Sequence, residues 1–162
     1  MVNSPNRYSI ALLSLAAVLS LSACASHSSN ERVQTRTLLS AAQDVNPDLN
    51  GRPSPVVVRI YQLRGDAEFS KADFAGLFMR EKEVLGANLI DVEEFDLHPG
   101  ESLETRLPMA RDTRYIAAAA GFRDIGNAQW RTLQQRPSRS IFFSERIGVK
   151  VDRGALALSI KH

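Results

Sequence analysis

The sequence of 162 residues contains few of the residues on which disulfide-bonded, metal-binding or strongly charged proteins depend. Its single cysteine excludes an intramolecular disulfide and any metal site built from several cysteines. Its three histidines, at positions 27, 98 and 162, lack the spacing of a zinc motif. Twenty Lys and Arg oppose 18 Asp and Glu, and the basic residues are scattered along the chain, so we predict no nucleic-acid partner. The length and a hydrophobic fraction of 44% are typical of one globular domain.

The first 23 residues have the pattern of a secretory signal peptide. Arg7 precedes the uncharged apolar run 10–21, which is shorter than the roughly 20 residues that a membrane-spanning helix needs. The run ends in Leu21-Ser22-Ala23-Cys24, which contains the only cysteine. This tetrapeptide resembles the lipobox of bacterial lipoproteins, and the resemblance implies cleavage before Cys24 and acylation of that residue. The alternatives are an ordinary signal peptide followed by a chance cysteine, or a buried free thiol.

The lipobox resemblance also implies a location. Stable anchoring takes about two acyl chains, and a bacterial lipoprotein has three. Ala25 stands where Asp is the usual inner-membrane retention signal, so the implied location is the outer membrane, facing the periplasm. Residues 24–32 are mostly small and polar, so we predict a lipidated flexible tether there and a folded domain over residues 33–162. We expect no cofactor besides the lipid on Cys24.

From residue 33 onward, short alternating segments predict a mostly β domain. The clearest is VVVRIYQL, residues 56–63, which places Val56, Val58 and Ile60 on one face of a strand. The alanines of residues 115–122 also suit a helix, but Gly121 and the β-type flanking residues favour a buried strand. The other predicted strands cover residues 33–42, 89–97, 103–107, 130–134, 147–151 and 155–160, with turns at His98–Glu101 and Asp152–Gly154.

Residues 70–85 have a helical period instead. Apolar residues recur at intervals of three, four and seven, Ser70 with Asp73 resembles a capping box, and Gly86 is a natural stop. We therefore predict one or two short helices, with the apolar stripe in the core: Phe74, Leu77, Phe78, Val84 and Leu85. About eight short strands with one helical insertion predict a mainly β, two-sheet antiparallel sandwich.

Few residues indicate catalysis. The acidic run Asp91, Glu93, Glu94 and Asp96 suggests paired carboxylates, but alternation along a strand divides these residues between two faces. We interpret the run as a solvated edge strand protected against aggregation. The sequence contains neither a Gly-x-Ser-x-Gly elbow nor a glycine-rich phosphate loop. We therefore predict that the protein is not an enzyme.

The most informative segment is NPDLNGRPSP, residues 46–55, between the first two predicted strands. Three prolines and Asn50-Gly51 exclude regular structure, and the segment is longer than an ordinary hairpin loop. A stiff loop loses little entropy on binding, which favours a role in recognition over that of a plain connector. Leu49 is its only large apolar residue and Arg52 its only cation. Leu49 either projects toward a partner or folds back onto the sandwich.

Three segments resemble one family. NPDLNGRPSPVVVRIYQL after a lipobox, and the later SKADFAGLF and VLGANLI, resemble the TssJ family of outer-membrane lipoproteins of the type VI secretion system. The resemblance implies a transthyretin-like β-sandwich with extra helices. It implies that the protein docks the periplasmic part of the inner-membrane protein TssM, and through TssM the TssL-containing inner-membrane complex. It also implicates the loop between the first two strands, so the expected partner-binding residues are Asn46, Pro47, Asp48, Leu49, Asn50, Gly51, Arg52 and Pro53.

Within this loop we expect Leu49 to insert into the partner and Arg52 to pair with a partner carboxylate or carbonyl. An alternative is a periplasmic ligand-binding lipoprotein, because transthyretin-like sandwiches also bind solutes. That function needs an apolar cavity with convergent polar groups. A hydrolase would need a catalytic cluster that the sequence does not suggest. The loop Gln134–Phe143 has no assigned role.

Overall fold

The computed structural model describes residues 32–137 and 144–161. Residues 31–162 form one compact unit. The predicted signal peptide, Cys24, nearly all of the predicted tether, and residues 138–143 of the predicted Gln134–Phe143 loop lie outside the described residues. Their assignments stay predictions.

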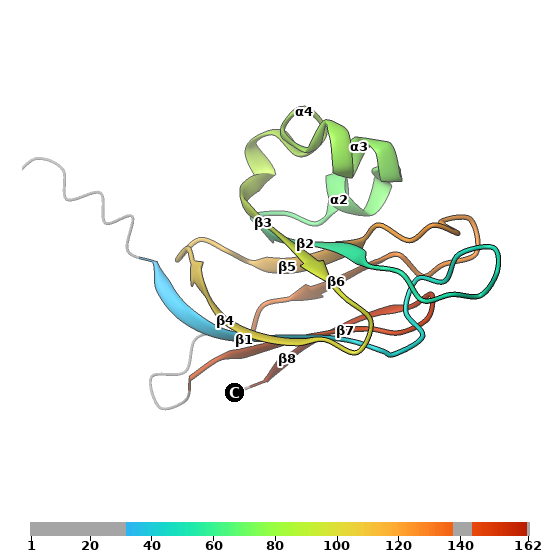
Figure 1. The fold of residues 1–162 in the computed structure, drawn as a ribbon. Coiled ribbons are helices and arrows are strands. Elements are labelled where there is room, and N and C mark those ends of the chain that lie inside the picture. Colours follow the sequence, from blue (N-terminus) through green and yellow to red (C-terminus); the bar gives the residue numbers. More distant parts are fainter. Residues whose placement is uncertain (1–31, 138–143, 162) are drawn as a thin grey trace, which may run out of the picture. The chain divides into compact units, whose positions relative to one another are not determined.

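The described residues form two four-stranded sheets, as the sequence pattern predicts (Figure 1). The first sheet has the order β4 (Ser102–Met109), β1 (Val33–Ala41), β7 (Arg146–Val151) and β8 (Leu156–Lys161). The second has the order β3 (Leu89–Leu97), β2 (Val56–Leu63), β5 (Tyr115–Ala120) and β6 (Arg131–Gln135). The β1–β7 pair is parallel, whereas the other strand pairs within these sheets are antiparallel. This exception arises because the chain crosses from β6 to the other sheet and enters β7 at the end where β1 begins.

A hydrophobic core fills the space between the two sheets. The predicted inward face of β2 is buried, with Val58 fully inaccessible to solvent. On β1, alternate residues from Thr35 to Ala41 are buried, but Val33 on the same face is 41% exposed because it begins the strand at the edge of the core. On β8, Leu156 and Leu158 are buried and Ile160 is half-buried. The period-two pattern therefore identified the core faces, with deviations at strand ends.

The helical insertion differs from the prediction in detail. It consists of three short α-helices and a 3-10 turn: α2 (Ala67–Lys71), α3 (Phe74–Met79), α4 (Glu81–Leu85) and η2 (Gly86–Asn88). The insertion begins before Ser70, which lies within α2 and caps no helix. Asp73 is the N-cap of α3, and its carboxylate accepts a hydrogen bond from the Gly76 amide at 2.7 Å. Ala72 is extended and interrupts the helix, which explains why the run is divided.

These helices cover the outer face of the β3-β2-β5-β6 sheet (Figure 1). Leu77 and Leu85 pack there with Tyr61, and the small Ala117 and Ala119 of β5 complete the same cluster. The Tyr61 hydroxyl donates a hydrogen bond of 2.9 Å to the Leu77 carbonyl. Burial raises the pKa of Tyr61 to about 12, so the hydroxyl remains a donor at neutral pH. Of the predicted apolar stripe, Leu77 and Leu85 are buried in this cluster, whereas Phe74, Phe78 and Val84 are half-buried, so the stripe is core only in part.

The acidic run lies on an edge strand, as predicted, because β3 pairs only with β2 in its sheet. Glu94 accepts a hydrogen bond of 2.6 Å from the Arg59 Nε of β2, and Asp91 forms an ion pair with Arg32. Asp96 is exposed. The carboxylates are thus solvated or paired with arginines across the sheet edge, which discourages pairing with another strand.

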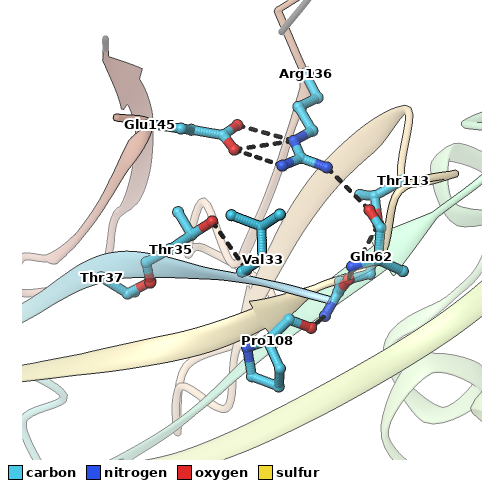
Figure 2. A network of polar contacts seen from close by, with 9 residues as sticks. Val33, Thr35, Thr37, Gln62, Pro108, Thr113, Arg136 and Glu145 are labelled. Carbon is cyan, nitrogen blue, oxygen red and sulfur yellow. Dashed lines mark hydrogen bonds and ion pairs between the residues drawn. The ribbon is translucent and has the colours of Figure 1, made fainter. Parts of the chain in front are cut away.

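A buried polar network joins the two sheets at the end where β1 begins (Figure 2). The Gln62 side chain is 1% exposed, and its oxygen accepts from the Ala110 amide at 2.9 Å and the Thr113 hydroxyl at 3.0 Å. Arg136 donates to the Ala110 carbonyl at 3.0 Å and forms three contacts of 2.6–3.0 Å with the Glu145 carboxylate. The side chains of this ion pair are only 6% and 12% exposed. The pair therefore connects the end of β6 to the segment before β7.

Replacing Glu145 by glutamine is expected to lower the free energy of unfolding by about 3 kcal/mol, because it leaves a nearly buried guanidinium without its counter-charge. Urea denaturation followed by circular dichroism measures this change. The matched control is Glu104→Gln, which removes the partner of Arg36 in an ion pair whose side chains are each more than half exposed. The control is expected to cost far less, because solvent screens this exposed pair. Equal costs for the two variants would contradict the structural role of the buried pair.

Candidate functional site

The predicted recognition loop lies at the end of the sandwich where β1 finishes and β2 starts. The β5–β6 connection and the β7–β8 hairpin lie at this same end (Figure 1). Residues 46–55 contain no helix or strand, as their prolines predict. The loop nevertheless has a defined conformation, which is fixed separately at its base and at its tip.

Asn46 fixes the base of the loop. It is 4% exposed and has a positive φ of 48°, a conformation that asparagine tolerates better than most residues. Its side-chain amide donates to the Pro55 carbonyl at 2.6 Å, and its side-chain oxygen accepts from the Arg123 amide at 2.8 Å. Its own amide donates to the Arg153 carbonyl at 3.1 Å. Asn46 therefore connects three loops, and this burial does not favour the predicted contact of its side chain with a partner.

Asp48 fixes the tip. One carboxylate oxygen accepts hydrogen bonds from the amides of Asn50 and Arg52, at 2.8 and 3.0 Å, and the other accepts from the Arg52 Nε at 2.9 Å. Gly51, with a φ of 78°, provides the tight turn expected of the Asn-Gly pair. The bond from the Arg52 backbone, with smaller contributions from the other donors, lowers the pKa of Asp48. The ionised carboxylate therefore stabilises the turn fully at pH values above the ordinary pKa of a carboxyl group. The turn loosens as the pH falls through the lowered pKa of Asp48.

The tip presents Leu49 to solvent. Leu49 exposes 106% of its reference surface, so the alternative that it folds back onto the sandwich is wrong. Pro53 is also exposed, whereas Pro47 is half-buried. Arg52 differs from expectation, because its guanidinium already pairs with Asp48 at 2.9 Å. It braces the turn from within the chain, and 79% of its side chain remains accessible.

A hollow of about 1040 Å³ opens beside the tip. Residues 46–50 form one wall, the β5–β6 connection forms another, and the β7–β8 hairpin closes it. Its side chains are mixed in charge, with Arg123 and Arg153 beside Asp48 and Asp124. The hollow is open to solvent, unlike the side-chain-filled space between the sheets. If the protein were a periplasmic ligand-binding lipoprotein, the alternative function, this hollow would be the place for the ligand.

The structure brings together most of the predicted site and adds walls that the sequence did not indicate. Asn46 to Pro53 form one continuous segment with Leu49 at its tip. Phe122, Arg123, Asn127 and Arg153 join the site only through folding. No local signal marks these residues, because their proximity depends on which strand ends meet. Among residues 32–137 and 144–161, no group of three or more His, Cys, Asp or Glu is arranged to hold a metal ion.

Comparison with known proteins decides the family. A family model described as "Type VI secretion lipoprotein, VasD, EvfM, TssJ, VC_A0113" matches residues 34–154, from β1 through β7. The chain belongs to this type VI secretion lipoprotein family. The match confirms the resemblance found in the sequence. No curated protein matches the chain.

Solved structures agree with the family assignment. The T6SS lipoprotein TssJ1 from Pseudomonas aeruginosa is 26% identical with a TM-score of 0.74, over 81% of this chain and 98% of that chain. A chain of a structure described as "Type VI membrane complex" is 26% identical with a TM-score of 0.68, over 78% and 97%. A chain of "T6SS protein TssM C-terminal domain (869-1107) from EAEC" is 25% identical with a TM-score of 0.63, over 78% and 98%. These matches confirm the predicted β-sandwich of this type VI secretion lipoprotein.

The described part of this family member contains no helix long and apolar enough to cross a bilayer. Its candidate site consists of the loop surface with its braced turn, the exposed Leu49 and the adjacent open hollow.

Proposed function

We propose that this type VI secretion lipoprotein is acylated at Cys24, is held in the outer membrane facing the periplasm, and docks the periplasmic part of TssM. The contact is made by the loop of residues 46–53, with Leu49 at its centre. Through TssM the protein connects to the TssL-containing inner-membrane complex. The role is that of an anchor and adaptor, without an enzymatic step.

The position of the loop supports this proposal. The proposed tether leads into Val33, the first residue of β1, and the loop follows the other end of that strand. Nine strand residues span about 30 Å at roughly 3.3 Å per residue. A domain anchored through its N-terminus therefore has its tether and its docking loop at opposite ends of the sandwich. This separation suits a protein that connects a membrane to a partner across an aqueous space.

The comparisons support the choice of partner. One matching chain belongs to a structure described as a type VI membrane complex. Another belongs to a structure whose description names the TssM C-terminal domain. Both matches cover more than three quarters of this chain. We infer from them that the partner of this chain is its own system's TssM.

The exposed Leu49 is the observation on which the docking proposal rests. A fully exposed leucine contributes nothing to the folded core, yet here the Asp48 turn holds it in a fixed position. Interfaces gain most of their energy from a few such anchors inserted into partner pockets. Because the turn is already formed, little entropy is lost when it binds.

Leu49→Ala is expected to weaken binding of the periplasmic part of TssM by about 2 kcal/mol, roughly 30-fold. The thermal midpoint should stay nearly unchanged, because Leu49 has no internal packing to lose. Isothermal titration calorimetry with the periplasmic TssM domain measures the affinity. Asp48→Ala is expected to weaken binding as well, by releasing the turn.

The matched control is Met79→Ala. Met79 is a large apolar residue with 78% exposure, and it lies in α3, away from the loop. Its replacement is expected to leave the affinity unchanged. If Leu49→Ala binds as tightly as the unmodified chain, the docking surface lies elsewhere and the proposal for this loop fails.

A further inference from the structure

Four basic residues form a continuous row across the outer face of the β4-β1-β7-β8 sheet. Arg36 of β1 is the register partner of Arg106 on β4 and of Arg146 on β7, and Arg146 is the partner of Lys161 on β8. All four are exposed, and each alternates with inward-facing core residues of its strand. With neighbouring strands about 4.8 Å apart, the row spans about 14 Å.

Little negative charge offsets this row. Glu104 is the carboxylate that the described part of the sheet places beside it, and Arg36 holds Glu104 through contacts of 2.7 and 2.8 Å. The hydrogen bond from Arg36 lowers the pKa of Glu104, and the charges of Arg106 and Arg146 lower it further. Lys150, farther along the same face, is neutralised by Asp152 at 2.9 Å. Four cations with one carboxylate leave this end of the sheet clearly positive.

A shallow apolar patch adjoins the row. Leu38 is 49% exposed, and its register partner Gly148 has no side chain to cover it. The result is a hollow of about 330 Å³ on the open sheet face, with Arg36, Arg146 and Lys161 among its lining residues. Exposed cations around a small apolar surface are the composition found where proteins lie against anionic bilayers.

The row is located at the membrane-proximal end of the proposed arrangement. Arg146 is the first residue of β7, Lys161 is the last of β8, and Arg36 is the fourth of β1, so these three lie near the end of the sheet where β1 begins. Cys24 precedes Val33 by nine residues, which span at most about 30 Å when fully extended. The proposed lipid anchor on Cys24 therefore keeps the row within reach of the headgroups.

We propose that the row Arg36, Arg106, Arg146 and Lys161 binds the anionic lipid surface of the membrane in which the protein is anchored. The contact turns a point attachment by acyl chains into a defined orientation of the sandwich. The loop of residues 46–53 follows the opposite end of β1, so the row leaves it uncovered. The position of the row near the membrane rests on the proposed acylation of Cys24, whereas its affinity for anionic lipid is independent of that acylation and of TssM.

The test uses residues 24–162 with Cys24→Ser, which keeps the whole compact unit of residues 31–162 but removes the lipid. Flotation is measured with phosphatidylcholine vesicles, with and without about one-third phosphatidylglycerol. Binding is expected to require phosphatidylglycerol and to fall at high salt. Each cation near an anionic bilayer contributes roughly fivefold to binding, so the triple variant Arg106→Gln, Arg146→Gln and Lys161→Gln is expected to bind about 100-fold more weakly.

The matched control removes the same number of charges from the helical insertion, as Lys71→Gln, Arg80→Gln and Lys82→Gln. All three residues are exposed, and they lie on the side of the molecule opposite the row. The affinity of this control for the vesicles should fall less than about 10-fold, compared with about 100-fold for the row variant. Equal losses would show that net charge alone acts. Absence of binding by the lipid-free chain that keeps all four cations would show that the row faces an acidic protein or solvent. Either result overturns the proposal, while TssM binding by the same chain tests the docking loop separately.

Discussion

A chain carrying Val58→Asp is expected to lose about 5 kcal/mol or more of unfolding free energy, enough to unfold many domains of this size. Val58 is fully buried between the sheets, with Phe95 and Ala120 as its register neighbours. The cluster around it is apolar, so an aspartate there is either an unpaired buried charge or a neutralised acid without a hydrogen-bond partner. Circular dichroism in increasing urea measures the loss.

Two controls separate burial of charge from other effects. Val58→Thr nearly keeps the shape but replaces one methyl group with a hydroxyl, and it is expected to cost about 1–3 kcal/mol. Val33→Asp makes the same change on β1, where 41% of the side chain is exposed, and is expected to cost much less. If Val58→Asp unfolds at the same urea concentration as the unmodified chain, the arrangement of the two sheets is wrong.

A chain carrying Cys24→Ser is expected to incorporate no palmitate and to be released from the membrane fraction by a high-salt wash, which also removes attachment through the basic row. The reason is that acyl chains on this residue supply the salt-resistant part of the proposed attachment, and the sequence has no other cysteine. The fold should be unaffected, because residues 31–162 form a compact unit that contains both hydrophobic clusters. Fractionation of cells labelled with radioactive palmitate measures both effects.

Ser26→Ala is the matched control for this experiment, since it changes one atom in the same polar segment and leaves the cysteine in place. It should be labelled and fractionated like the unmodified chain. Equal labelling of the Cys24→Ser chain would place the lipid elsewhere and would remove the basis for the proposed anchor. The result of this experiment does not change the outcome of the vesicle experiment, because the vesicle experiment already uses a chain without lipid.

The sequence predicted most of the fold because its signals are local. Alternation along residues 56–63 identified the buried face of β2, and the alanines of β5 proved to be buried in a strand. The helical insertion was correct in kind but wrong in its internal divisions, since an extended Ala72 depends on how α2 and α3 pack against the sheet. Alternation alone also did not predict that residues at strand ends, such as Val33, are exposed on the core face.

The candidate site shows the same division. Leu49 stood out in the sequence as the only large apolar residue between prolines, and the structure leaves it fully exposed. The buried role of Asn46 was not apparent, because two of its partners come from Arg123 and Arg153, far along the chain. The internal pairing of Arg52 with Asp48 was local in sequence but required the turn geometry around Gly51.

The sequence by itself determined the strand faces, the position and stiffness of the loop, and the lipobox-like segment, because each depends on residues that are neighbours in the chain. Only the tertiary structure decided the parallel β1–β7 pair, the three-walled hollow beside Leu49 and the basic row. In sequence the cations of the row lie far apart, at positions 36, 106, 146 and 161. Strand order and register bring them side by side. Register is set by long-range pairing that buries one face of each strand, so the charges on the opposite face are aligned by the packing of the core.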